Sequence, residues 1–118
     1  MNNVEFYENV PDKSKLEVSF GPDDKPFTGS VIFITSGDVD DATWSDEEVR
    51  PGPKVQELEK GRAYMLEMRA AFLKDAEATI TARIRKPDGS VFSKPKVWTI
   101  QGKKKKIELR VLIIRMAA

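Results

Sequence analysis

Residues 62–74, RAYMLEMRAAFLK, decide the fold class of this chain. Apolar side chains occupy every second position from Tyr64 to Phe72, which is the period of a strand with one buried face. The segment is also rich in good helix formers and contains no helix breaker. Because propensity is a weak guide outside its tertiary context, we favour the strand. The strand predicts an all-β fold, whereas a helix at 62–74 would make the fold α+β.

The segments that follow predict a meander of strands. Residues 76–86 alternate between apolar and polar side chains, so we expect a strand that pairs with the preceding one through a turn at 74–75. Residues 87–89 read Pro-Asp-Gly, which is the chemistry of a tight turn. Residues 90–100 form the next expected strand. Because Pro95 has no N–H to donate to a neighbouring strand, we expect this strand to lie at a sheet edge or to carry a bulge.

The last expected strand, 107–116, is apolar on both of its faces. Its odd-numbered apolar positions share one face, which we expect to lie in the core. Leu112, Ile114 and Met116 share the other face, which in a two-layer sandwich would meet water. Because proteins rarely expose a contiguous apolar patch, these three residues are a predicted interface. Either a second copy of the chain, in a homodimer, or the N-terminal arm would cover them.

The N-terminal half supplies further expected strands. Residues 14–20 alternate cleanly and predict a half-buried strand, and the apolar run within 27–35 predicts a central strand buried on both faces. Residues 1–12 are expected to form a loose arm. We therefore expect residues 13–118 to fold as a single two-sheet antiparallel sandwich of about seven strands.

The segment from Leu58 to Tyr64, LEKGRAY, is similar to a motif of β-sandwich proteins. It resembles the tyrosine corner of immunoglobulin-like and fibronectin type III-like domains, in which a Leu precedes a Gly-containing turn and a Tyr opens the next strand. The resemblance implies that the Tyr64 hydroxyl returns to nearby backbone and fixes a crossing between the sheets. It differs from those domains in that three further expected strands follow. It implies architecture and no particular function.

The composition excludes several functional classes. The 118 residues include no cysteine and no histidine. A disulfide framework, a zinc site built on these residues and a Ser-His or Cys-His nucleophile pair are therefore excluded. We predict no cofactor and no enzymatic activity. No apolar run is long enough to span a membrane. The localisation stays open between cytoplasmic and secreted after removal of a signal.

Charge is distributed unevenly along the chain. Residues 1–60 carry 14 acidic and 6 basic side chains, whereas residues 61–118 carry 5 acidic and 14 basic ones. Segregated in space, these halves would attract partners or other copies of the chain. A sandwich mixes strands from both halves, so we favour mutual neutralisation within the fold.

The densest acidic cluster, which includes Asp38, Asp40 and Asp41, lies close in sequence to Trp44. Several converging carboxylates could hold Ca²⁺, but the spacing does not match an EF-hand loop, so we predict no metal site and favour a solvated acidic loop. Trp44 lies in this polar setting and is the better candidate of the two tryptophans for stacking against a carbohydrate, since Trp98 alternates with core residues.

Four adjacent lysines, Lys103, Lys104, Lys105 and Lys106, precede the last strand. They could contact phosphate groups or anionic lipid. However, adjacent residues at a hairpin alternate faces, and few exposed aromatic residues accompany them, so nucleic acid is not favoured. A solvated turn that protects a strand edge is the preferred interpretation.

Together these features predict a non-catalytic binding or assembly module that presents loops or a sheet face to another macromolecule. The expected partner is another protein or a second copy of the chain. The alternative is a lectin-like carbohydrate-binding module, with or without calcium, that uses Trp44 and the acidic cluster. An enzyme is the third and least favoured hypothesis.

Overall fold

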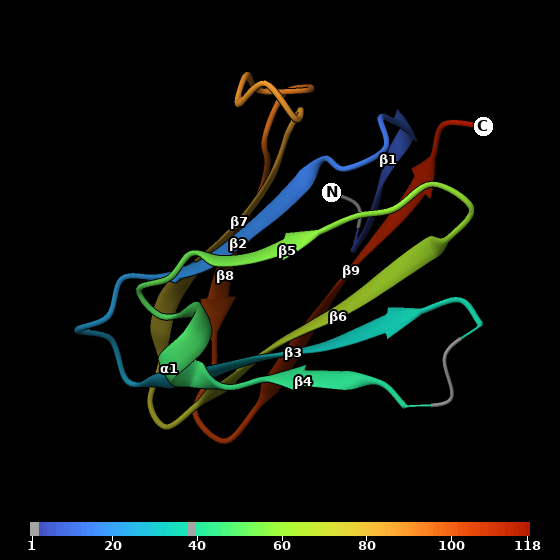
Figure 1. Cartoon of the computed structure of the whole chain (residues 1–118). Helices are drawn as coiled ribbons and strands as arrows, with labels where there is room; N and C mark the ends of the chain where they lie inside the picture. The colour runs from blue at the N-terminus through green and yellow to red at the C-terminus, as the bar shows by residue number, and fades with distance from the viewer. Residues whose placement is uncertain (1–2, 38–39) are drawn as a thin grey trace.

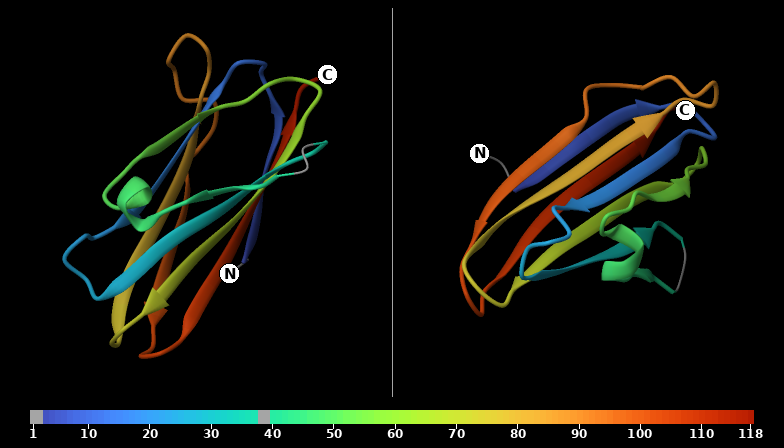
Figure 2. Two further views of the ribbon diagram at one scale, coloured as in Figure 1. Left: turned by 60° about the horizontal axis from the view of Figure 1, so that its bottom comes forward. Right: turned by 90° about the vertical axis from the view of Figure 1, so that its left-hand side faces the viewer.

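The structure is a computed structural model that describes residues 3–37 and 40–118, and it is an all-β sandwich of two sheets (Figures 1 and 2). The five-stranded sheet has the order β1 (Val4–Val10), β9 (Ile107–Met116), β6 (Ala63–Phe72), β3 (Phe27–Thr35) and β4 (Ala42–Trp44). The four-stranded sheet has the order β5 (Lys54–Glu57), β2 (Lys15–Gly21), β7 (Ala76–Arg85) and β8 (Lys96–Gly102). The described residues thus contain nine strands rather than about seven, and one short helix, α1 (Asp46–Val49).

The segment that decides the fold class is extended, as predicted, but its expected partner was wrong. β6 pairs with β3 on one side and with β9 on the other. Both hydrogen-bonding edges of β6 are therefore occupied, and none is left for β7. At the end of β6, the Leu73 N–H donates to the Pro26 carbonyl, and β7 continues in the opposite sheet. The chain thus crosses between the sheets where a hairpin was expected.

The core lies between the two sheets and is built from strict alternation. In β2, Leu16, Val18 and Phe20 are buried, as predicted. In β7 the inward side chains are Ala78, Ile80, Ala82 and Ile84. Full burial of one Val, Leu, Ile or Phe side chain is worth about 1.5–3 kcal/mol. Strand β3 follows the same rule: one face is buried and the other is half-buried, which corrects the expectation that both faces are buried.

Residues 4–10, which fall within the expected loose arm, form strand β1. It pairs in parallel with β9, so the sandwich is not wholly antiparallel. The Tyr7 side chain is 2 % exposed, and its hydroxyl lies 3.0 Å from the Lys94 carbonyl and 3.3 Å from the Ala82 carbonyl, to which it donates. Burial raises the pKa of this hydroxyl above its usual range. β1 is thus paired within its own sheet and hydrogen-bonded to β7 and to the β7–β8 connection.

The two faces of β9 were predicted the wrong way round. Leu112 and Ile114 are fully buried in the core, and Met116 packs against it. Their register explains this, because Leu112 pairs with Leu66 and Ile114 pairs with Tyr64, and these β6 side chains point inward. The predicted interface of Leu112, Ile114 and Met116 is therefore covered by the four-stranded sheet. The odd-numbered side chains of β9 point outward instead.

The tyrosine-corner contact that the resemblance implies is present. The Glu59 N–H donates to the Tyr64 hydroxyl at 2.9 Å, and Leu58 is fully buried. In broad terms the sandwich is compatible with an immunoglobulin-like fold. One difference is that β7 and β8, which come between β6 and β9 in the sequence, belong to the opposite sheet.

The acidic and basic halves of the chain interleave, because each sheet contains strands from both. Ion pairs between described residues join the halves, among them Glu5–Lys96, Glu8–Arg115 and Glu17–Arg85. As expected, the acidic side chains of the first half and the basic side chains of the second half partly neutralise each other within the fold.

At two places an aromatic ring from one sheet packs on a glycine of the other sheet. The ring of Phe20 in β2 lies on Gly29 in β3, and the ring of Phe72 in β6 lies on Gly102 at the end of β8. A methyl group at either glycine would overlap the ring. Glycine is needed at these positions for close approach, since neither has a positive φ.

We predict that Gly102→Ala lowers the free energy of unfolding by about 1–3 kcal/mol, the usual cost of overpacking a core. Urea denaturation would measure this. In a Phe72→Leu background the same change should cost less, because the overlapping ring is gone. An equal cost in both backgrounds would contradict the packing explanation.

Candidate functional site

Trp44 is not the exposed aromatic platform that its polar sequence neighbourhood indicated. It lies on β4 opposite Val31, points into the core and is 3 % exposed. Its ring stacks on Phe33 with the centroids 4.9 Å apart. The prediction of a carbohydrate-stacking surface at Trp44 is therefore wrong, because strand pairing turns the ring inward.

The acidic cluster is dispersed among structural roles. Asp38 lies outside the described residues, and Asp40 and Asp41 are exposed. The Asp46 carboxylate accepts a hydrogen bond from the Gly29 N–H at 2.6 Å. Glu48 caps the short helix and lies 2.9 Å from the Lys54 ammonium, which holds the pKa of its carboxyl below the usual range. Within the described ranges, no three potential metal ligands gather at one point.

The four lysines Lys103, Lys104, Lys105 and Lys106 form the exposed turn between β8 and β9, at the lower end of the molecule in Figure 1. Asp75, in the β6–β7 turn, lies beside them. Its carboxylate accepts the Lys104 N–H at 2.8 Å and lies 3.8 Å from the Lys103 ammonium. The turn is thus held by a carboxylate and exposes its ammonium groups.

The most distinctive surface is the outer face of the five-stranded sheet, here called the apolar face. It consists of the outward side chains of β1, β9, β6, β3 and β4. The strand registers place two rows across it, perpendicular to the strands. One row runs Phe6, Ile113, Met65, Ile34, and the other runs Val4, Val111, Glu67, Ile32, Thr43.

Several side chains of the apolar face are open to solvent. Phe6 is 43 % exposed, and Leu109 and Ile107, further along β9, are 42 % and 67 % exposed. Ile113, the strand partner of Phe6, lines a shallow hollow of about 220 Å³. It is lined by Ile34, Ser36, Ala63, Tyr64, Met65 and Ile113. The face therefore combines a protruding aromatic ring with an apolar depression.

The charged side chains that point outward on the apolar face form two opposite-charge pairs. Arg115 lies 2.6 Å from the Glu8 carboxylate, and its guanidinium sits 5.3 Å from the centroid of the Phe6 ring. Arg69 lies 3.8 Å from Glu67. Two acids and two bases thus leave this part of the surface without net charge.

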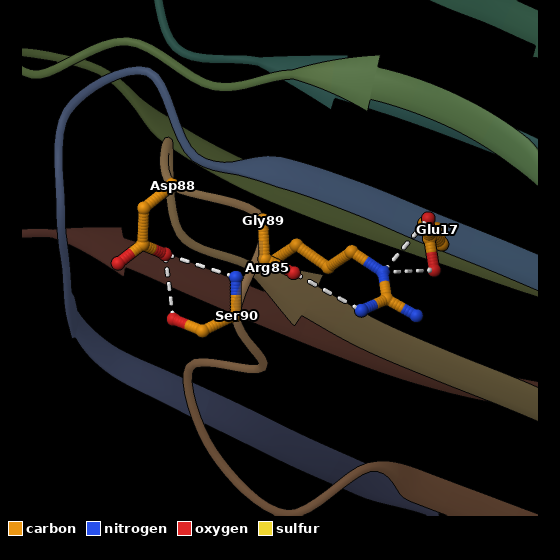
Figure 3. A network of polar contacts seen from close by, with 5 residues as sticks. All are labelled: Glu17, Arg85, Asp88, Gly89 and Ser90. Atoms are coloured by element: carbon orange, nitrogen blue, oxygen red, sulfur yellow. Dashed lines mark hydrogen bonds and ion pairs between the residues drawn. The ribbon is translucent and has the colours of Figure 1, made fainter.

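The outer face of the four-stranded sheet is different in character. Its strands present mainly hydroxyl and charged side chains, and Arg85 lies 3.2 Å from both carboxylate oxygens of Glu17 (Figure 3). Arg85 also donates to the Gly89 carbonyl at the turn that leads towards β8. In the same turn, the Asp88 carboxylate accepts bonds from the Ser90 hydroxyl at 2.6 Å and the Ser90 N–H at 2.9 Å, and these bonds lower the pKa of Asp88. This face is a solvated polar network.

Sequence reasoning missed the apolar face because it assigned the inward face of β9 to solvent and β1 to a loose arm. A signal for β1 was nevertheless present. The apolar Val4 and Phe6 lie two residues apart on either side of Glu5, which is the period of a strand. Pairing that strand with β9 would have placed Phe6 beside an apolar residue.

Comparisons of the chain with protein-family models, with curated proteins and with solved structures found no match. In the part of the chain that the structure describes, no helix is long and apolar enough to cross a membrane.

We predict that Ser90→Ala raises the pKa of Asp88 towards its value in the unfolded chain. In the folded protein the Ser90 bonds favour the charged carboxylate, so their contribution to stability is present above the unfolded pKa and is lost as the pH falls through the folded pKa. NMR titration of the Asp88 carboxyl, in the folded and in the urea-unfolded chain, would measure both values. An unchanged pKa in the variant would contradict the assigned cause.

Proposed function

We propose that this chain is a non-catalytic binding or assembly module that docks on another macromolecule through the apolar face. The observation that carries the proposal is the row Phe6, Ile113, Met65, Ile34, which crosses four strands without a charged side chain. Apolar surface in contact with water is unfavourable in proportion to its area. Large exposed apolar patches with a polar rim are typical of interaction sites.

Non-catalytic binding is also supported by chemistry. The sequence has neither histidine nor cysteine, and the carboxylates of Asp46 and Glu48 serve the backbone and neighbouring cations. The lectin-like alternative depended on an exposed Trp44, and the burial of that ring removes its main support.

We further infer that the sandwich is a variant of the immunoglobulin-like plan. Tyr64, which carries the tyrosine corner, lies near the start of β6, between β3 and β9. In immunoglobulin-like domains the strand with this motif likewise lies between two neighbours of its own sheet. The β7–β8 pair would then be an insertion before the last strand. This inference concerns architecture and leaves the choice of partner open.

The proposed function predicts site-specific contacts. A photoreactive p-benzoylphenylalanine is placed at Ile113 on the apolar face or, as a control, at Val97, which is 58 % exposed on the opposite sheet. The purified chain and an extract of the organism that makes it are then irradiated. We expect discrete adducts from position 113 and none from 97, with the partner identified by mass spectrometry. Equal labelling from both positions, or no adduct from 113 in either sample, would overturn the proposal.

A further inference from the structure

We infer that the occupant of the apolar face is a second copy of this chain, in a two-fold symmetric dimer in which Phe6 of each copy enters the hollow of the other. This inference rests on the proposed function and names its partner. In a two-fold contact, residue i of one copy meets residue j of the other, and j meets i. A surface fits itself in this way when it carries both a projection and a matching depression.

The apolar face carries both features side by side. Phe6 pairs with Ile113 across the β1–β9 edge, and Ile113 is also a wall of the hollow. The Phe6 ring is 43 % exposed and is available as a projection. The hollow, at about 220 Å³, is large enough for a phenyl ring, and its walls are mainly aliphatic side chains.

The size of the face is sufficient for a specific dimer. Strands lie ~4.8 Å apart and advance ~3.4 Å per residue, so the four long strands present on the order of 600 Å². Two copies would bury about 1,200 Å² in total, above the roughly 1,000 Å² that a specific interface needs. Face-to-face packing of two sheets is also a standard arrangement, with the side chains of the two faces interdigitated.

The charges of the face favour an identical partner over an acidic or basic one. Glu8 with Arg115, and Glu67 with Arg69, cancel within each copy. Two such faces can meet without net repulsion. A strongly acidic or basic partner would gain no electrostatic attraction, because the face has no excess of the opposite charge. The lysine turn, which could attract an anionic partner, lies at the end of the sandwich, where β8 leads into β9.

Sedimentation velocity of the whole chain, from low to high micromolar concentration, tests the dimer. We expect a concentration-dependent species of twice the 13.3 kDa chain mass. Phe6→Ala, which removes the projection, and Ala63→Trp, which fills the hollow from an exposed position, should each weaken dimerisation at least about tenfold. Val97→Lys, on the other sheet, should leave it unchanged. Circular dichroism confirms that each variant is folded.

A mixture of the two variants gives the sharpest test. Phe6→Ala retains the hollow and Ala63→Trp retains the projection, so a heterodimer keeps one intact contact while either homodimer keeps none. We expect the equimolar mixture to dimerise at concentrations where each variant alone is monomeric. A wild-type chain that stays monomeric at high micromolar concentration would overturn the inference that the partner is a second copy. In that case, adducts from Ile113 with another protein would still support the apolar face as a docking surface. Dimers that are insensitive to both variants, or a mixture that stays monomeric, would also overturn the inference.

Discussion

The pairing of β6 with β9 determines which side chains of the five-stranded sheet enter the core. Its register runs without interruption from Ala63 opposite Arg115 to Ala71 opposite Ile107. Because side chains alternate along a strand, a slip of one residue would turn every β9 side chain to the other face. The observed register buries Leu112 and Ile114 against the four-stranded sheet and turns Val111 and Ile113 outward. One pairing thus fixes both the core and the apolar face.

Much of the fold could be predicted from local patterns, but local patterns could not show which face of β9 points into the core. Strict alternation is sufficient to identify β2 and β7 as strands, and it favours a strand over a helix for β6. β9 is apolar on both faces, so periodicity does not say which one meets the other sheet. That choice depends on the strand partners, which are distant in sequence. The same reason explains the wrong partner expected for β6.

The candidate site was harder to predict than the fold. The binding residues predicted from the sequence were clusters of like charge, namely the acidic segment around Trp44 and the lysines Lys103–Lys106. Hydrogen bonds give Asp46 a structural role and hold the lysine turn, and strand pairing turns Trp44 inward. The apolar face is assembled from strands at both ends of the chain, so no single stretch of sequence contains it. Its contrast with the polar outer face of the other sheet appears when the strands are paired.

Isotope-filtered NOE spectroscopy on a mixture of ¹³C-labelled and unlabelled chain tests most directly whether the apolar face is the contact surface. We expect intermolecular contacts from the methyl groups of Ile34, Met65 and Ile113 to aromatic protons of Phe6 in the other copy. Intermolecular contacts from Val97 on the opposite sheet, or no intermolecular contacts at millimolar concentration, would contradict it.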